Sequence, residues 1–351
     1  MRSAACRRTA VIGLAVGLWG SFLAGLVRGQ TEQRKRAHFE HADVVYDWVT
    51  NGRGEKLRTF VTRPRNSTGK VPVIFFVGWL SCDSMEYPET PTDDGFGILI
   101  HRLIEESGYA TVRMDKPGVG ESQGNCEKAD FNDEMTGWRA AFESMSKYDF
   151  IDAARVIVVG LSNGGGFSPL AAGEHAVRGY VSAGSWGRTW YEHMLELERR
   201  RLEHAKKSPA EVNASVKAFA DFYNLYLMKG MTPGQVLAQH PEWKGLWYDS
   251  ADGQYGRPAA FYQQLQALNL GEVWQKVNAP VLVIRGTADT IMSRADSEEI
   301  VKSVNAAHAR QARYLEIEGM THDFMINMKF PADLVPTMLT WMRERVEKPD
   351  R

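Results

Sequence analysis

The sequence has almost no excess of charge of either sign, because 42 lysines and arginines stand against 43 aspartates and glutamates in 351 residues. Nucleic-acid-binding domains usually carry a clear basic excess, so the near-neutral balance gives no support for a nucleic-acid partner. The chain also lacks the clustered histidine, cysteine and aspartate spacing of a zinc site, internal repeats and low-complexity segments. What remains is an ordinary globular composition, 44% hydrophobic. We expect one large domain with an insertion rather than two independent domains.

Cysteine is scarce, with three residues in the chain. Cys6 belongs to a segment in which arginines precede an apolar run over 9–27 and small residues follow. This pattern is typical of a signal peptide, so we expect residues 1–29 to be removed and the protein to be secreted or periplasmic. An uncleaved membrane anchor is the alternative, because the run approaches spanning length. The mature chain keeps Cys82 and Cys126, an even pair that could form a disulfide in an oxidising compartment.

Strand and helix patterns alternate along most of the chain. Residues 41–50 and 56–63 alternate in polarity around an Asn-Gly turn, which indicates an antiparallel hairpin at a sheet edge. The continuous apolar run 71–77 is typical of a buried strand. Further strands are expected at 109–114, 155–159, 178–183, 280–285 and 313–317, and helices at 96–107, 131–148, 167–174, 293–305 and 333–346. The alternation predicts an α/β fold with a mostly parallel sheet of about eight strands flanked by helices.

The alternation stops between residues 186 and 270. No strand pattern is found there, and Ser208 and Thr232 each begin a capping box with proline in the first turn, which indicates helices. We predict a helical cap insertion over 186–270, which divides the core into 30–185 and 271–351. Its many aromatic side chains should mostly pack against the sheet, and some should line a substrate pocket.

The most informative stretch is the turn Gly160-Leu161-Ser162-Asn163-Gly164, which follows the strand expected at 155–159. A serine in a tight strand-to-helix turn takes a strained backbone, and glycines on either side let the turn close. The hydroxyl then stands clear at the carboxyl edge of the sheet, where the Asn163 N–H and the following helix can hold an oxyanion. The alternative is a glycine-rich loop, since the chain has 32 glycines.

A serine hydroxyl needs a base within hydrogen-bond reach, and the chain offers nine histidines. His322 follows the last expected strand on a short loop, which places it at the same sheet edge as Ser162; the others lie in the amino-terminal arm, in or after helices, or in the insertion. Asp289 follows the preceding strand at that edge and is the candidate to orient the imidazole. Of its competitors, Asp296 falls inside a helix and Asp323 is too close to His322 in sequence.

Four motifs in this order resemble those of the α/β-hydrolase family. Residues 115–122 resemble its D-x-x-G-x-G-x-S turn, 160–164 its nucleophile elbow, 280–289 its acid strand and 319–322 its histidine loop. The resemblance covers nearly the whole mature chain. It implies an α/β-hydrolase fold and a catalytic triad formed by the serine, aspartate and histidine named above.

The resemblance also implies a second oxyanion donor in the loop after the third strand, often His-Gly-x. Here Val77 replaces the histidine, but the donor is a backbone N–H, with Trp79 the best match and Leu80 second. The strands that precede Cys82 and Cys126 are neighbours in the family's sheet, so a disulfide between them should clamp this loop. Our candidates for the substrate pocket are Leu80, Trp186, Trp190 and Met320.

The family's chemistry implies hydrolysis through an acyl-enzyme, without a metal or organic cofactor. We expect a small-molecule carboxylic ester as substrate. Cleavage of amides or short peptides is the alternative, because the chain also resembles the serine-aminopeptidase-like and prolyl-oligopeptidase-like branches. An aminopeptidase needs a carboxylate to bind the substrate amine, and Glu86, Asp93 and Asp94 are candidates for it. The alternative is that these acidic residues belong to a solvated loop. Ser162 argues against the aspartate-dependent dehalogenases of this fold, and the complete triad argues against a non-catalytic binding protein. Nothing in the sequence indicates the oligomeric state.

Overall fold

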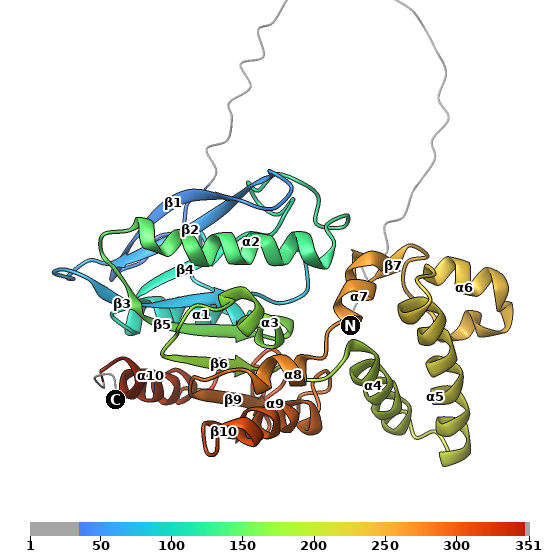
Figure 1. The fold of residues 1–351 in the computed structure, drawn as a ribbon. Coiled ribbons are helices and arrows are strands. Elements are labelled where there is room, and N and C mark those ends of the chain that lie inside the picture. Colours follow the sequence, from blue (N-terminus) through green and yellow to red (C-terminus); the bar gives the residue numbers. More distant parts are fainter. Residues whose placement is uncertain (1–34, 348–351) are drawn as a thin grey trace, which may run out of the picture. The chain divides into compact units, whose positions relative to one another are not determined.

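An eight-stranded sheet forms the centre of the structure, a computed structural model that describes residues 35–347 (Figure 1). The strand order is β1-β2-β4-β3-β5-β6-β9-β10. Its strands are β1 (Ala42–Thr50), β2 (Lys56–Pro64), β3 (Val71–Val77), β4 (Ala110–Met114), β5 (Ile151–Leu161), β6 (Gly179–Ala183), β9 (Val281–Gly286) and β10 (Ala312–Ile317). β1 and β2 pair antiparallel, as do β2 and β4, and every pair from β4 to β10 is parallel. The predicted α/β fold with a mostly parallel sheet is confirmed.

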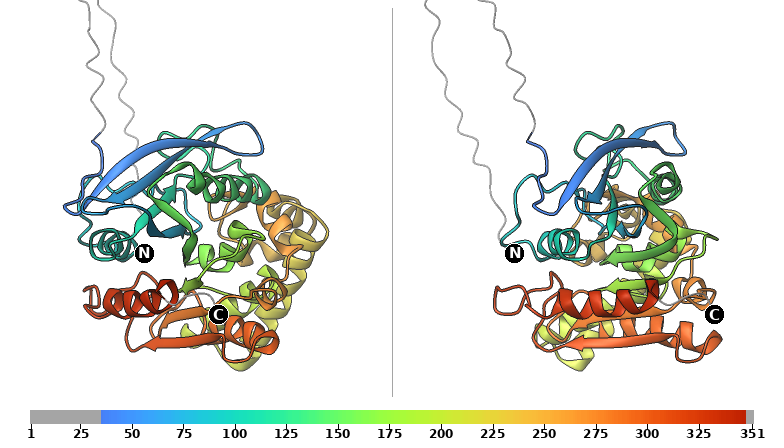
Figure 2. Two further views of the ribbon diagram at one scale, coloured as in Figure 1. Left: turned by 60° about the vertical axis from the view of Figure 1, so that its left-hand side comes forward. Right: turned by 90° about the vertical axis from the view of Figure 1, so that its left-hand side faces the viewer.

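Helices cover both faces of the sheet, which explains why the central strands are apolar throughout (Figure 2). One layer holds α1 (Gly95–Glu106) and α10 (Leu334–Val346); the other holds α2 (Phe131–Glu143), extended by a 3₁₀ turn (Ser144–Lys147), α3 (Asn163–Ala172), α8 (Leu270–Gln275) and α9 (Arg294–Ala307). Local sequence fixes where several of them begin. The side chains of Asp130 and Ser293, for example, accept hydrogen bonds from the third helical residues of α2 and α9. Residues from Arg36 onward form one compact unit.

Two elements at the centre differ from the expected boundaries. The helix expected to start at residue 167 begins at Asn163, directly after the elbow. We interpreted the glycines after the elbow as turn residues, but they belong to the first turn of α3 because the helix packs very closely on the end of β3. A Cβ on Gly164 would lie 2.2 Å from the carbonyl oxygen of Val77. β5 begins at Ile151, earlier than expected, because it pairs with β3 across a register shift.

Residues between β6 and β9 form mostly helices, shown to the right of the sheet in Figure 1. They are α4 (Trp190–His204), α5 (Pro209–Tyr223), a π-helical turn (Asn224–Met228), α6 (Pro233–Gln239), a 3₁₀ turn (Pro241–Leu246) and α7 (Ala259–Gln266). α5 and α6 start at the predicted capping boxes of Ser208 and Thr232.

We expected no strand between β6 and β9, and this was wrong. β7 (Gly253–Gln254) and β8 (Arg257–Pro258) are strands of two residues each that form a short antiparallel hairpin. The pairing is tight: a Cβ on Gly253 would lie 1.8 Å from the carbonyl oxygen of Arg257. So short a hairpin leaves no alternating pattern in the sequence.

The signal peptide predicted for residues 1–29 lies outside the described residues. Across residues 35–347, none of the helices is both long and apolar enough to span a bilayer.

Candidate active site

Ser162 occupies the turn between β5 and α3 with a backbone that few residues adopt. Its φ of 55° and ψ of −127° lie outside the regions favoured by residues with a side chain. Packing holds the turn on both sides, because Cβ atoms on Gly160 or Gly164 would lie within 2.4 Å of other atoms of the elbow or of β3. The strained turn therefore presents the hydroxyl to the cavity at the carboxyl edge of the sheet, and the surrounding fold maintains the strain.

Three side chains from distant segments meet at this edge. The Ser162 Oγ lies 3.0 Å from His322 Nε2, and His322 Nδ1 lies 2.9 Å from Asp289 Oδ2. Since a carboxylate only accepts hydrogen bonds, this arrangement keeps a proton on Nδ1 and leaves Nε2 free to accept the serine proton. The ring edge of Phe96 lies against the imidazole, with centroids 5.9 Å apart. The geometry thus connects nucleophile, base and carboxylate in one chain of hydrogen bonds.

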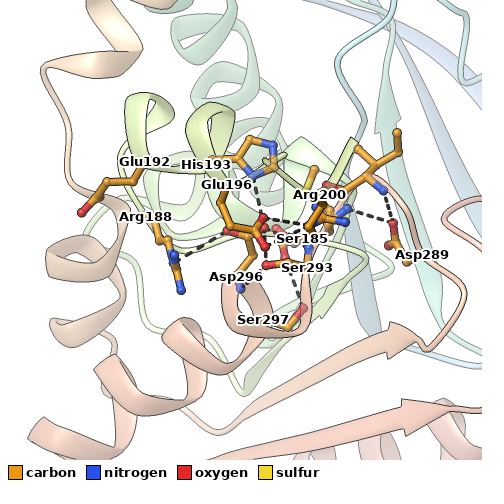
Figure 3. Close-up of polar contacts among 12 residues, drawn as sticks. Ser185, Arg188, Glu192, His193, Glu196, Arg200, Asp289, Ser293, Asp296 and Ser297 are labelled. Atoms are coloured by element: carbon orange, nitrogen blue, oxygen red, sulfur yellow. Dashed lines mark hydrogen bonds and ion pairs between the residues drawn. The ribbon is translucent and has the colours of Figure 1, made fainter. Parts of the chain in front are cut away.

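The acid loop (Asp289–Met292) is fixed from two directions. The backbone N–H groups of Ile291 and Met292 each donate to Asp289 Oδ1 at 2.8 Å, which leaves Oδ2 for the histidine. Arg285 in β9 donates to the carbonyls of Asp289 and Met292. Arg200 in α4 donates to the carbonyls of Thr290 and Ile291, and Figure 3 shows this side chain reaching toward the loop. Contacts from α4 and β9 therefore hold this loop together.

The oxyanion loop (Gly78–Ser81) follows β3 and lies beside the serine. The backbone N–H groups of Trp79 and Asn163 have no hydrogen-bond partner among the described residues, and both residues line the same cavity as Ser162. Two unpaired N–H groups beside a serine are the donors that a tetrahedral oxyanion requires. The loop and the start of α3 can therefore supply both donors proposed from the sequence.

Buried cations hold the other side of the oxyanion loop. Lys116 donates to the carbonyls of Trp79 and Ser81, and Arg257 donates to the carbonyl of Leu80. Glu134 lies between them, hydrogen-bonded to Arg257 and 3.9 Å from the Lys116 ammonium. Burial lowers the pKa of Lys116 to about 8, although Glu134 opposes the shift. These hydrogen bonds fix the oxyanion loop through its carbonyl oxygens.

Cys82 and Cys126 form a disulfide, with Cα atoms 6.0 Å apart. Cys82 directly follows the oxyanion loop, and the carbonyl of Cys126 accepts a hydrogen bond from Arg257. The bond therefore joins the loop after β3 to the segment after β4, the connection expected from the resemblance.

A cavity of about 330 Å³ opens beside the serine. Its walls are mostly apolar and aromatic, and they come from the oxyanion loop, α1, α4, the acid loop and the histidine loop: Trp79, Leu80, Ser81, Phe96, Ser162, Asn163, Trp190, His193, Met194, Leu197, Tyr255, Ile291, Met292 and His322. Leu80 and Trp190 were expected in a substrate pocket. Trp186 and Met320 were expected there too, but both are fully buried behind the lining.

The carboxylates considered for an aminopeptidase point elsewhere. Glu86 is buried against the Tyr46 hydroxyl at 2.7 Å, and Asp94 caps the start of α1. Asp93 is an exposed loop residue. None of the three is among the residues that line the cavity in the described part of the chain. Over the same residues, no group of three or more histidines, cysteines and acidic residues is placed to hold a metal ion.

Sequence reasoning missed the residues that support the site. Lys116 lies within the recognised turn 115–122, but its sequence position does not reveal that its side chain reaches the oxyanion loop. Arg200 and Arg257 lie in the insertion, where the sequence shows charge but no partner. His193 was assigned to the insertion and given no role, although it lines the cavity.

Comparison with known protein families agrees with this geometry. Residues 99–328, more than half of the chain, match the family model described as serine aminopeptidase, S33. The chain belongs to this serine aminopeptidase family. It is a serine hydrolase with the α/β-hydrolase fold. A search of curated proteins returned no match.

Solved structures with the same fold include both esterases and peptidases. Est1E from Butyrivibrio proteoclasticus, solved with ferulic acid, aligns with a TM-score of 0.59 and 18% identity over 86% of this chain and 100% of its own. A Pyrococcus furiosus esterase aligns at 0.54 and 14%, over 87% of this chain and 92% of its own. Dipeptidyl peptidase 4 of Porphyromonas gingivalis aligns at 0.55 and 11%, over 87% of this chain and 36% of its own. At these identities the likeness concerns the fold alone.

Proposed function

We propose that this member of the family hydrolyses carboxylic esters through an acyl-enzyme formed on Ser162. The observation that carries the proposal is the continuous hydrogen-bonded chain from the Ser162 hydroxyl through His322 to Asp289, beside an apolar cavity. His322 removes the hydroxyl proton as Oγ attacks the ester carbonyl, and Asp289 stabilises the imidazolium that forms. The carbonyl oxygen of the ester becomes an oxyanion that accepts hydrogen bonds from the N–H groups of Trp79 and Asn163.

The second half of the reaction uses the same groups. The imidazolium donates its proton to the leaving alcohol, which departs and leaves the acyl group on Ser162. A water molecule then loses a proton to His322 and attacks the acyl carbonyl at the same oxyanion site. Collapse of this second intermediate returns the proton to the serine and releases the carboxylic acid.

The lining of the cavity favours an ester over an aminopeptidase substrate. A free amino terminus is a cation, and its burial is unfavourable unless a carboxylate faces it. The described residues that line the cavity include no aspartate or glutamate, and Glu86, Asp93 and Asp94 lie outside it. An uncharged apolar acyl group of small or medium size fits these walls better.

A panel of matched substrates tests the proposal. We expect hydrolysis of p-nitrophenyl esters with short and medium acyl chains, loss of that activity in Ser162→Ala, and negligible cleavage of aminoacyl p-nitroanilides with a free amine. Cleavage of the anilides at rates equal to the esters would favour the amidase or aminopeptidase alternative. Absence of activity on every substrate, with an unreactive serine, would favour a binding protein.

We also propose that the protein is secreted or periplasmic. The disulfide between Cys82 and Cys126 supports an oxidising compartment, and the amino-terminal pattern supports a cleaved signal. Mass measurement of the mature amino terminus from the native host tests this. A mature chain that begins near residue 30 is expected, and an intact terminus in the membrane fraction would support the anchor instead.

A further inference from the structure

His193 of α4 is a polar side chain in the wall of the apolar cavity. It is 1% exposed and lines the cavity together with Trp190. Its Nδ1 lies 3.2 Å from Asp296 Oδ2 (Figure 3). The ring stacks on Trp186 with centroids 5.6 Å apart, and Trp190 lies at 5.4 Å. Because Nδ1 faces Asp296 and the ring packs against both tryptophans, we infer that the ring edge with Nε2 faces the cavity.

The hydrogen-bond partners of Asp296 decide which ring nitrogen carries a proton. Asp296 Oδ2 also accepts from the backbone N–H and the hydroxyl of Ser293, each at 2.9 Å. Burial alone would raise the pKa of Asp296, but His193 and these hydrogen bonds outweigh it and leave the pKa below its usual value. An ionised carboxylate accepts only, so His193 Nδ1 donates to it.

A cationic side chain also faces the carboxylate that His193 contacts. The guanidinium of Arg188 lies 3.8 Å from Asp296 Oδ1, on the side of the carboxylate away from the imidazole in Figure 3. A neutral ring with its proton on Nδ1 presents a lone pair at Nε2. Among the described residues no hydrogen-bond donor reaches this nitrogen.

We propose that His193 Nε2 accepts a hydrogen bond from a hydroxyl group on the substrate, so that the enzyme selects aryl esters that carry a hydroxyl at the end of an apolar body. The aromatic part of the substrate packs against Trp79, Phe96, Trp190 and Tyr255, which line the same cavity. Nε2 has no partner among the side chains that the structure describes, and a substrate hydroxyl can supply the donor. The inference rests on the proposed ester hydrolysis and names its substrate class.

Pairs of esters that differ only in one hydroxyl test the inference. The pairs are the methyl esters of 4-hydroxybenzoate, 4-hydroxyphenylacetate and 4-hydroxyphenylpropanoate with their deoxy counterparts. The same hydroxyl is offered on the alcohol side by 2-(4-hydroxyphenyl)ethyl acetate and phenylethyl acetate. One neutral hydrogen bond should raise kcat/KM for the best-fitting hydroxylated ester by about three- to tenfold over its partner. The esters differ in the distance between the hydroxyl and the ester group, and we expect the preference to be largest where that distance places the hydroxyl at Nε2.

Variants on one helix assign the preference to His193. His193→Phe keeps an aromatic ring between the tryptophans but removes the acceptor, so the hydroxyl preference should fall to about one. His193→Gln places an amide oxygen near Nε2 and should keep part of the preference. His204→Phe makes the same substitution at an exposed position of α4, and its preference should equal that of the wild type. Each preference is a ratio within one protein, so a change in overall activity does not affect it.

Several results would overturn the inference. Equal hydrolysis of every pair by the wild type would overturn it and leave ester hydrolysis standing, even if His193→Phe fails to fold. An unchanged preference in His193→Phe would do the same. Preference for a monomethyl ester of a dicarboxylic acid would show that the ring binds an anion as a cation instead. No ester hydrolysis, together with no labelling of Ser162 by a fluorophosphonate, would remove the proposed function and the inference with it.

Discussion

At the scale of single residues, Asp289 shows how local contacts prepare a side chain for chemistry. Its two oxygens have separate tasks, because the N–H groups of Ile291 and Met292 occupy Oδ1 while His322 faces Oδ2. The carboxylate is 3% exposed, so water does not compete for these positions. We infer that its task is to hold one tautomer of His322.

Asp289→Asn tests that task. An amide can donate to Nδ1 and so stabilise the tautomer with its proton on Nε2, which cannot accept the serine proton. We expect kcat/KM for p-nitrophenyl esters to fall by about 10³- to 10⁴-fold with little change in the unfolding midpoint. Steady-state kinetics and urea unfolding of the purified variant measure both. A loss below tenfold would mean that another carboxylate orients the base.

That Ser162, Asp289 and His322 meet at one sheet edge could be predicted from sequence, and the contacts around them could not. Ser162, Asp289 and His322 each follow an apolar strand, so parallel strands place them at one edge. The pairing of His193 with Asp296 leaves no such pattern, because it joins two helices from different parts of the chain. Asp296 was weighed only as a competitor of Asp289 for the role of orienting His322.

At the scale of elements, the elbow and the oxyanion loop form one packed unit. Gly164, in the first turn of α3, packs directly on the last residues of β3 and on Gly78. Sequence reasoning identified this glycine as part of the elbow but ended the turn too late, because three glycines in a row resemble a loop. The structure shows that Gly164 lacks a side chain because α3 packs closely on the end of β3.

Gly164→Ala tests that packing. The added Cβ would lie 2.2 Å from the carbonyl oxygen of Val77 and 2.3 Å from that of Gly78, so the loop must move. We expect a loss of about 1–3 kcal/mol in stability. A shift of the oxyanion donors by about 1 Å should reduce kcat by about 10²-fold. Gly245→Ala is the control, because no atom lies within 4 Å of its added Cβ. Equal behaviour of the two variants would contradict the close packing.

Lys116 provides a test on the other side of the loop. The pKa of this buried ammonium is lowered by burial from 10.5 to about 8. Between these pH values the unfolded chain binds a proton that the folded chain does not, so a rise in pH stabilises the fold through this residue. We expect the unfolding free energy of the wild type to increase relative to Lys116→Met between pH of about 8 and 10.5.

Urea unfolding of both proteins across that range measures the effect, and subtraction removes the titration of groups they share. A difference that does not depend on pH would contradict the burial of the ammonium. Lys116→Met should also reduce esterase activity, because the carbonyls of Trp79 and Ser81 lose their donor.

At the scale of the whole molecule, segments far apart in the sequence hold the site from several sides. The segment between β6 and β9 contributes Arg200 to the acid loop and Arg257 to the oxyanion loop. The order of core elements was predictable from alternating patterns and four motifs, whereas these cross-connections depend on three-dimensional packing that no local pattern encodes. The predicted boundaries 30–185, 186–270 and 271–351 stay a prediction about domains.

The disulfide between Cys82 and Cys126 adds a covalent link between distant segments beside the site. It closes a segment of 44 residues between β3 and α2, and the chain-entropy model gives about 4 kcal/mol for a loop of this length. We therefore expect the Cys82→Ala/Cys126→Ala double variant to lose up to about that free energy of unfolding, and to lose activity through the freed oxyanion loop. Urea unfolding under non-reducing conditions is the measurement. Two thiols titrating in the oxidised wild type would show that the bond does not form.

Active-site labelling shows whether Ser162, His322 and Asp289 act together as one hydrolytic unit. The folded protein is incubated with a fluorophosphonate, digested and examined by mass spectrometry, beside His322→Ala and a urea-unfolded sample. We expect an adduct on Ser162 in the folded wild type and little or none in the other two samples. An unmodified Ser162 in the folded wild type, or equal labelling in His322→Ala, would contradict it.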